Sequence, residues 1–315
     1  MTQVISIHTV TDILGIIPPL LGFVPDDCVV VVATREGRMV VAARLGLEET
    51  TVQMDLAGQV TAAARQVHAD SAFIVGYHTS PNSNAIPLVN LLLDALPTFG
   101  ITPHAPIYVT GDQNGDAVYH CMCTDPGCDA IGKVPPPTRI EGILEAAVSR
   151  QAIVERVAAG PRSAAVGEAM AHLSGRMTAE EAEAAVQSVL GCDSVDHLTN
   201  DQVALAAHAL RVSHHQVRAA IGLPMTAKEA DFGGVQQRLA DDPSRVDRLI
   251  EMAACLPDNR ATACLEVLAA NAYWCGNGTL ANIALKRIGS RRLSWVGDLI
   301  DKAIEEGTSP ANYRP

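Results

Sequence analysis

Three consecutive prolines, Pro135 to Pro137, divide the sequence into two parts with different patterns. Proline lacks a backbone N–H and has a fixed φ angle, so neither an α-helix nor a central β-strand can run through this stretch. Strand-like and helix-like patterns alternate before the prolines, whereas the patterns after them are almost purely helical. We therefore predict an N-terminal α/β domain over residues 1–135 and a helical domain over residues 136–315.

The N-terminal part begins with a hairpin signal. Cys28–Ala33 is nearly continuous in valine, Glu36–Arg38 suits a turn, and Met39–Leu45 resembles a second strand. Beyond these we expect helices over 51–68 and 88–96 and strands over 72–77, 106–110 and 117–122. Continuous rather than alternating valines indicate that both faces of the central strands are covered. The expected fold class is α+β or α/β, with an N-terminal mixed sheet and helices followed by an all-α C-terminal region.

The C-terminal part shows apolar residues at helical spacing over most of its length. The expected helices span 139–159, 163–174, 178–190, 199–211, 242–255, 261–275, 279–288 and 293–306. Thr178 followed by Glu181 forms a capping-box pattern, which marks a helix start. Short glycine-containing links favour antiparallel packing, so we expect the region to end in a helical hairpin and a final helix.

Composition argues against several classes of protein. The chain is 48% apolar and carries a formal net charge of −12, whereas a general nucleic-acid binder needs a basic surface. The longest uncharged apolar stretch, Ile13–Val24, contains two prolines and is shorter than the roughly 20 residues that span a bilayer. Met1–Val10 shows no basic cluster before an apolar run, and the eight cysteines are scattered. We expect a soluble cytoplasmic protein that binds neither membranes nor nucleic acid.

Three stretches of the chain together carry a family resemblance. They are Pro19–Phe23 with Pro25–Asp27, the turn Cys121–Cys128, and Tyr273–Ala281 with the closing helix and Ser309–Pro310. In order and spacing they resemble the family called domain of unknown function 4192, which occurs in actinobacteria and their phages. The resemblance implies a cytoplasmic protein of actinobacterial or phage origin. It implies no known activity and therefore assigns no catalytic residue.

The chain departs from the pattern of that family at three places. Cys28 stands where serine is expected, and Gly46 stands after Arg44 where an aspartate often follows. The paired cysteines of the turn are here Gly127-Cys128. A family active site at any of these positions would be altered in this chain.

The cysteine-containing turn is the strongest candidate for chemistry. Thiolates and imidazole are the donors that tetrahedral zinc prefers, and an Asp-Pro-Gly turn could fold them inward. The four candidate ligands are His120, Cys121, Cys123 and Cys128. Their spacing differs from the usual zinc knuckles, and on a strand the histidine would face away from the first two cysteines. Three interpretations stay open: a structural zinc site with His104 or His78 as a further ligand, a redox-labile cysteine pair, and partly buried thiols without a ligand.

A second group of candidates lies where a loop enters the valine-rich strand. Asp26 and Asp27 could bind a divalent cation, or one could raise the pKa of the other and so create a base. The sequence also suits an ordinary turn, which we favour. A nucleophilic Cys28 would need a basic partner that lowers its pKa. With Arg44 and His78, these residues define an alternative hypothesis, an enzyme of unrecognised type with its site at the sheet edge.

None of the common catalytic motifs is present. The sequence contains no G-x-x-x-x-G-K-S/T loop, no G-x-G-x-x-G after a strand, no H-E-x-x-H and no G-x-S-x-G. The preferred hypothesis is a non-catalytic protein-interaction or regulatory module that binds a protein partner or forms a homo-oligomer. Its candidate anchors are Tyr273, Trp274 and Trp295, which could equally belong to the helical core. No cofactor is expected apart from the zinc of the alternative hypothesis, a metal-stabilised structural module.

Overall fold

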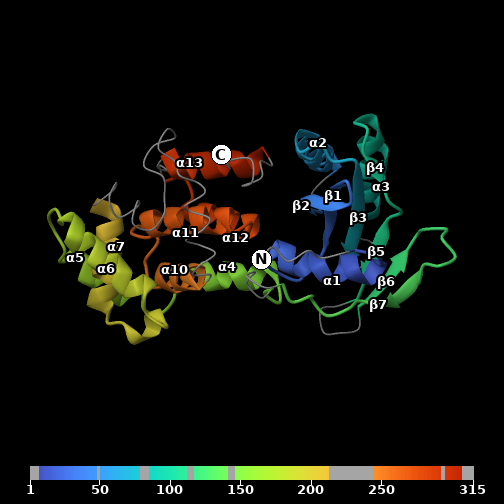
Figure 1. Ribbon diagram of the computed structural model, residues 1–315. Coiled ribbons are helices and arrows are strands. Elements are labelled where there is room, and N and C mark those ends of the chain that lie inside the picture. Colours follow the sequence, from blue (N-terminus) through green and yellow to red (C-terminus); the bar gives the residue numbers. More distant parts are fainter. Residues whose placement is uncertain are drawn as a thin grey trace. The chain divides into compact units, whose positions relative to one another are not determined.

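The computed structural model describes residues 7–47, 50–78, 85–111, 117–140, 146–212, 244–291 and 295–306, without the side chains of residues 50–53 and 295. The main division between two compact units falls after Arg150. The first unit contains a mixed sheet with helices, and the described part of the second is helical (Figure 1). This confirms the predicted fold class. Among the described helices, none is both long enough and apolar enough to cross a membrane.

One sheet forms the centre of the first unit. Its strands in the described residues are β1 (Cys28–Arg35), β2 (Arg38–Gly46), β3 (Ser71–His78), β4 (Thr102–Pro103), β5 (Ile107–Thr110), β6 (Val118–Cys121) and β7 (Ile131–Lys133). The strand order is β2-β1-β3-β5-β6-β7, and β4 pairs with β3 beside β5. β3 runs parallel to β4 and β5, whereas the other neighbours are antiparallel. The very short β4 and β7 have too few residues to show a periodic pattern in the sequence.

The predicted hairpin is formed by β1 and β2. Arg35 pairs with Arg38 across Glu36 and Gly37, whose φ angles are 51° and 71°. Positive φ at both central residues is typical of the type I′ turn, whose twist matches that of the flanking strands. The backbone N–H of Glu36 donates to Asp70 Oδ2 at 2.6 Å. This bond ties the hairpin turn to the residue before β3.

Helices α2 (Thr50–Gln66) and α3 (Ala85–Thr98) cover one face of this sheet (Figure 1). Their buried side chains form one apolar cluster with alternate residues of β1 and β3: Val29, Val31, Ala33, Ala72, Ile74, Ala57, Val60, Ala64, Ala85, Leu88, Val89, Leu92 and Leu96. The intervening residues of β1, such as Val30 and Val32, are equally buried. Both faces of this central strand are therefore covered, as the valine run predicts.

The first helix, α1 (Val10–Leu21), runs through Pro18 and Pro19, the two prolines that break the apolar stretch in the sequence. It contacts β2 and begins with a capping box between Thr9 and Asp12. Pro19 has no N–H to offer the carbonyl of Gly15, one turn earlier. That carbonyl instead accepts a hydrogen bond from the Thr138 N–H at 2.8 Å. Tertiary contact thus replaces the helical bond that the proline removes.

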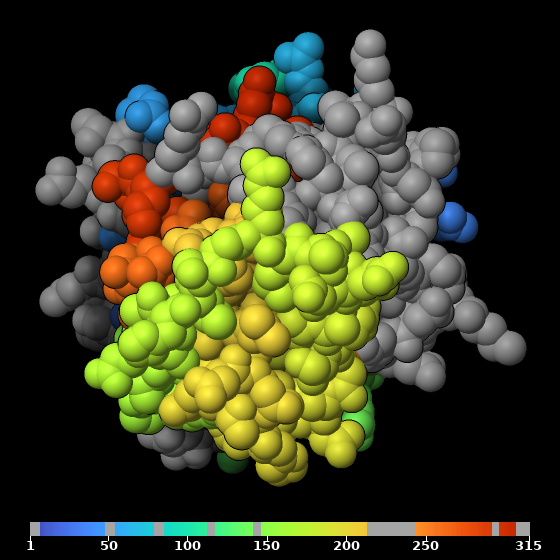
Figure 2. Space-filling view, turned by 90° about the vertical axis from the view of Figure 1, so that its left-hand side faces the viewer, coloured from blue at the N-terminus to red at the C-terminus, as the bar shows by residue number. Residues whose placement is uncertain are grey.

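The described helices of the second unit begin with α4 (Arg150–Val157), which is shorter than the helix expected over 139–159. The others are α5 (Ser163–Ala171), α6 (Ala179–Leu190), the short 3₁₀ helix η1 (Val195–His197), α7 (Asn200–Val212), α10 (Arg245–Ala254), α11 (Thr262–Trp274), α12 (Gly278–Ile288) and α13 (Trp295–Glu305). The predicted capping box is confirmed, since Thr178 Oγ1 accepts from the Glu181 N–H at 3.2 Å and Glu181 accepts from the Thr178 N–H at 2.9 Å. α5, α6 and α7 lie together in the foreground of the view in Figure 2.

α11 is the central helix of the second unit. Every side chain from Cys264 to Trp274 is buried, and the helix contacts α7, α10, α12 and α13. A helix that is buried all round needs apolar residues on every face, which explains its weak amphipathic pattern. The guanidinium of Arg287, on α12, donates hydrogen bonds to carbonyl oxygens of other segments, those of Val157, Ala253 and Leu256. Its contribution is therefore a set of hydrogen bonds between elements, beyond the helix-dipole effect that its position near a helix end suggests.

Candidate metal site

β6 and β7 form an antiparallel hairpin at one side of the sheet, and a cysteine-containing turn joins them. The Cys121 N–H donates to the Ala130 carbonyl at 2.7 Å, which closes the two arms of the turn. At its tip, Asp125 Oδ1 accepts from the Gly127 N–H at 2.9 Å, and its carbonyl accepts from the Cys128 N–H at 3.1 Å. These bonds reverse the chain at Asp-Pro-Gly and bring Cys128 back toward the other cysteines, as such a turn predicts.

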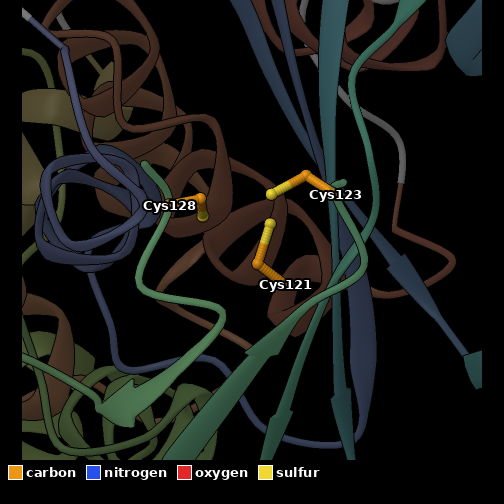
Figure 3. A group of neighbouring side chains, drawn as sticks. All are labelled: Cys121, Cys123 and Cys128. Carbon is orange, nitrogen blue, oxygen red and sulfur yellow. The ribbon is translucent and has the colours of Figure 1, made fainter. Parts of the chain in front are cut away.

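Cys121, Cys123 and Cys128 form a group that we call the thiol cluster. Their Sγ atoms all lie within 4.8 Å of one another, and each residue is half-buried. In Figure 3 the sulfur atoms of Cys121 and Cys123 point toward one another, and Cys128 lies across from them on the returning arm of the turn. Zinc–sulfur bonds of about 2.3 Å in tetrahedral geometry place sulfur atoms about 3.8 Å apart. Small side-chain movements would therefore let all three sulfur atoms contact one zinc ion.

The electrostatics of the thiol cluster favour one ionised sulfur. The pKa of Cys123 is lowered because the thiols of Cys128 and Cys121 hydrogen-bond to it. The pKa of Cys128 is raised, first by its hydrogen bond to Cys123 and then by burial, and burial also raises the pKa of Cys121. Cys123 thus ionises most readily, and the thiolate is the form that binds a metal ion.

The histidines considered as further ligands do not join this group in the described part of the chain. His120 directly precedes Cys121 on β6, so its side chain projects to the opposite face of the strand. His104 stacks on the ring of Phe73 with centroids 4.1 Å apart, and burial lowers its pKa. His78 packs edge-on against Tyr108 at the end of β3. Among the described residues, the cluster offers a metal three sulfur donors.

The sequence did not predict a close contact between the two strands of this hairpin. Gly132 of β7 pairs with Tyr119 of β6, and a Cβ atom at Gly132 would lie 2.7 Å from the Tyr119 ring. Only glycine leaves room for this buried ring, whose pKa is raised by burial and by neighbouring negative groups. The residues around Gly132 in the sequence do not indicate this contact, because the contact depends on the register between β6 and β7.

The second group of candidates lies at the end of the sheet where β3 finishes. Cys28, the first residue of β1, pairs with Tyr77, and His78 follows directly on β3. β6 runs antiparallel to β5 and so carries the chain away from this end toward the thiol cluster. β1 lies between β2 and β3, so Cys28 belongs to an interior strand rather than an edge strand.

The side chains of this second group differ strongly in burial. Cys28 is 0% exposed, and burial raises its pKa to about 11 although the charge of Arg44 opposes the shift. Asp26 and Asp27 are exposed, and Asp27 has a φ angle of 38°, which suits the predicted turn. The pKa of Asp26 is raised by partial burial and by the charge of Asp27, and Arg44 opposes this shift. The buried Cys28 thiol is therefore protonated at neutral pH and shielded from reagents. Neither property fits a nucleophile.

The aromatic residues considered as interface anchors belong to the second unit. Tyr273 and Trp274 are 3% and 6% exposed, and their rings meet edge to face with centroids 5.0 Å apart. They lie in the core around α11 in this structure. Trp295 is the first residue of α13, and its side chain lies outside the described residues.

Comparison with known proteins gives one match. The family model named domain of unknown function (DUF4192) matches residues 11–310, which is nearly the whole chain. No curated protein and no solved structure matches this chain.

Proposed function

The chain belongs to a family named only as a domain of unknown function, DUF4192, and we propose from its own residues that it binds zinc through the thiol cluster. The metal would stabilise the β6–β7 hairpin of a non-catalytic module. The observation that carries this proposal is the convergence of three half-buried sulfur atoms within 4.8 Å across a reversing turn.

The donor set favours zinc over the alkaline-earth ions. Thiolates are soft ligands that suit zinc and copper(I), whereas magnesium and calcium take oxygen ligands. A three-sulfur site leaves a fourth zinc position for water or for a ligand supplied from outside the described residues. Because thiolates bind the metal and thiols do not, zinc binding would release the protons of the cysteine ligands.

The β6–β7 hairpin has few apolar contacts that could stabilise it without a crosslink. β7 has three residues, and of these Ile131 is 67% exposed. Met122, at the start of the turn, is 61% exposed, so few apolar side chains of the turn contribute to a core. A zinc ion bound by Cys121 and Cys123 on one arm and Cys128 on the other would join the arms directly. The free energy of metal binding would then stabilise the folded turn.

The two other hypotheses stay predictions with weaker support. A protein partner would need a surface other than the one formed by Tyr273 and Trp274, because both are buried. An enzyme at the other end of the sheet would have to work without Cys28 as nucleophile, since that thiol is fully buried.

Metal content tests the proposal. Protein purified without a histidine tag and under reducing conditions should contain one zinc per chain, measured by mass spectrometry. The Cys123→Ser variant should bind zinc at least about tenfold more weakly, since it loses one of three thiolates. Cys275→Ser is the matched control because Cys275 is exposed and lies outside the thiol cluster.

Two results would count against the proposal. The first is a wild-type chain that takes up no zinc when titrated with it under reducing conditions. The second is equal loss of zinc in the Cys123→Ser and Cys275→Ser variants, which would place the metal elsewhere.

A further inference from the structure

The arrangement that suits a metal also suits a second chemistry. We propose that the thiol cluster is a site of reversible disulfide formation, in which Cys128 pairs with Cys121 or Cys123 and thereby releases bound zinc. Disulfide formation stands independently of zinc binding, whereas the release of zinc rests on the proposed function.

The geometry selects Cys128 as the common partner. Cys121 is the last residue of β6 and Cys123 is only two residues further along the chain, so a disulfide between them would close a small, strained ring. A bond between them would distort the end of β6. Cys128 instead comes from the opposite arm, which the hydrogen bond between Cys121 and Ala130 holds beside the first. A bond between the arms therefore needs side-chain rotation and little movement of the backbone.

Access to an oxidant also distinguishes this cluster. Its three cysteines are half-buried, whereas Cys28, Cys255 and Cys264 are buried. Cys192 is also half-buried and Cys275 is exposed, but neither belongs to a group of three or more possible metal ligands among the described residues. A small oxidant such as hydrogen peroxide would meet three neighbouring and accessible thiols at the hairpin, so an intramolecular disulfide is expected there.

The reaction is balanced with hydrogen peroxide as the oxidant. One cysteine sulfur attacks a peroxide oxygen, the O–O bond breaks, and a sulfenic acid and one water form. The second thiol then attacks that sulfenic sulfur, so that an S–S bond forms, the S–O bond breaks and a second water leaves. Two electrons pass from the two sulfurs to the peroxide, and both thiol protons end in water. One thiolate remains, which is too few to retain zinc.

Peptide mapping of the full-length protein tests this inference. The zinc-free and the zinc-loaded chain are each treated with stoichiometric hydrogen peroxide, trapped with an alkylating reagent and digested without reduction. We expect a disulfide-linked product that contains Cys128 and either Cys121 or Cys123, and a thiol reductant should reverse it. Zinc released into a chromogenic chelator should rise with the disulfide, to about one equivalent per disulfide.

Three variants provide the controls. Cys128→Ser should lower the yield of intramolecular disulfide by about tenfold or more, because it removes the common partner. Cys121→Ser and Cys275→Ser should each retain a disulfide within the cluster. If Cys121 links to Cys123 in the wild-type chain, or if all three cysteines stay reduced while Cys275 oxidises, the inference is wrong. A disulfide in a chain that binds no zinc would overturn the proposed function and leave the disulfide site intact.

Discussion

The two cysteine sites of the sheet have the same side chain in different environments. Cys28 lies in the interior strand β1, is 0% exposed, and has a pKa raised to about 11 by burial. In the thiol cluster, by contrast, Cys123 is half-buried and has a lowered pKa because two thiols hydrogen-bond to it. Environment therefore decides which cysteines act as small apolar core residues and which are available for ligands.

Position in the sheet explains this difference. β1 has a strand on each side and is covered on both faces, so its first residue is already part of the core. The turn after β6 is joined to the sheet mainly through the short β7. A core position selects a thiol for its size, whereas a surface turn leaves three sulfur atoms exposed enough to react.

The largest expected effect is the difference in stability cost when a charged side chain replaces a cysteine at each of the two sites. Cys28→Lys would place an ammonium in a fully buried position next to the guanidinium of Arg44, and should cost more than about 4 kcal/mol of unfolding free energy. Cys123→Lys would reach solvent from the turn and should cost less than about 1 kcal/mol in the metal-free protein. Urea denaturation of both variants under reducing conditions, with a chelator present, measures this difference. Equal costs would contradict the account of the two sites.

An intermediate effect on stability is expected where β7 packs against Tyr119. Gly132→Ala would bring a methyl group within 2.7 Å of the Tyr119 ring. The ring or β7 must then move, at a cost of about 1–3 kcal/mol in unfolding free energy. Gly127→Ala is the matched control in the same hairpin, because its Cβ would meet only Asp125 Oδ1 at an ordinary 3.4 Å.

The comparison of the two glycine variants uses the same denaturation measurement, with and without zinc. The Gly132→Ala chain should also bind zinc more weakly than the Gly127→Ala chain, since Tyr119 lies two residues before Cys121. If both variants unfold at the same urea concentration, Tyr119 does not support the turn as described.

The smallest effect is expected at Asp26. Its pKa is raised in the folded protein, so the folded state binds this proton more tightly than the unfolded state. The carboxyl therefore favours folding at low pH, and that contribution is lost as the pH rises from about 4 through the folded-state pKa. Asp26→Asn should be more stable than the wild type at pH 7 by less than about 0.5 kcal/mol, because the side chain is exposed. The difference should vanish at pH 3, and a variant less stable at pH 7 would contradict the sign.

Much of the fold could be predicted from local patterns. The valine run of β1, the Glu36-Gly37 turn and the capping box at Thr178 each specify local structure through their own residues. α1 could not be predicted, because the bond that compensates for Pro19 comes from Thr138, far along the chain. β7 is also set by pairing rather than by sequence pattern, since three residues show no periodicity.

The candidate site was predicted in part. The three cysteines of the turn and the Asp-Pro-Gly reversal could be identified from their residue types and spacing. Period-two alternation of β6 also indicated that His120 faces away from Cys121. The burial of Cys28 was harder to foresee, because it depends on β1 being an interior strand. The role of Gly132 depends on its register with Tyr119, which no single sequence segment encodes.

Protection of individual cysteines by zinc distinguishes a metal-binding thiol cluster from three unrelated thiols. The native chain is alkylated under reducing conditions with and without one equivalent of zinc, and modification of each cysteine is followed over time by mass spectrometry. We expect zinc to slow the alkylation of Cys121, Cys123 and Cys128 together, while Cys275 reacts at an unchanged rate and Cys28 stays unmodified in both samples. Zinc binding by the thiol cluster would be contradicted if Cys121, Cys123 and Cys128 reacted equally fast with and without zinc. The contrast between the two cysteine sites would be contradicted if Cys28 reacted as fast as they do.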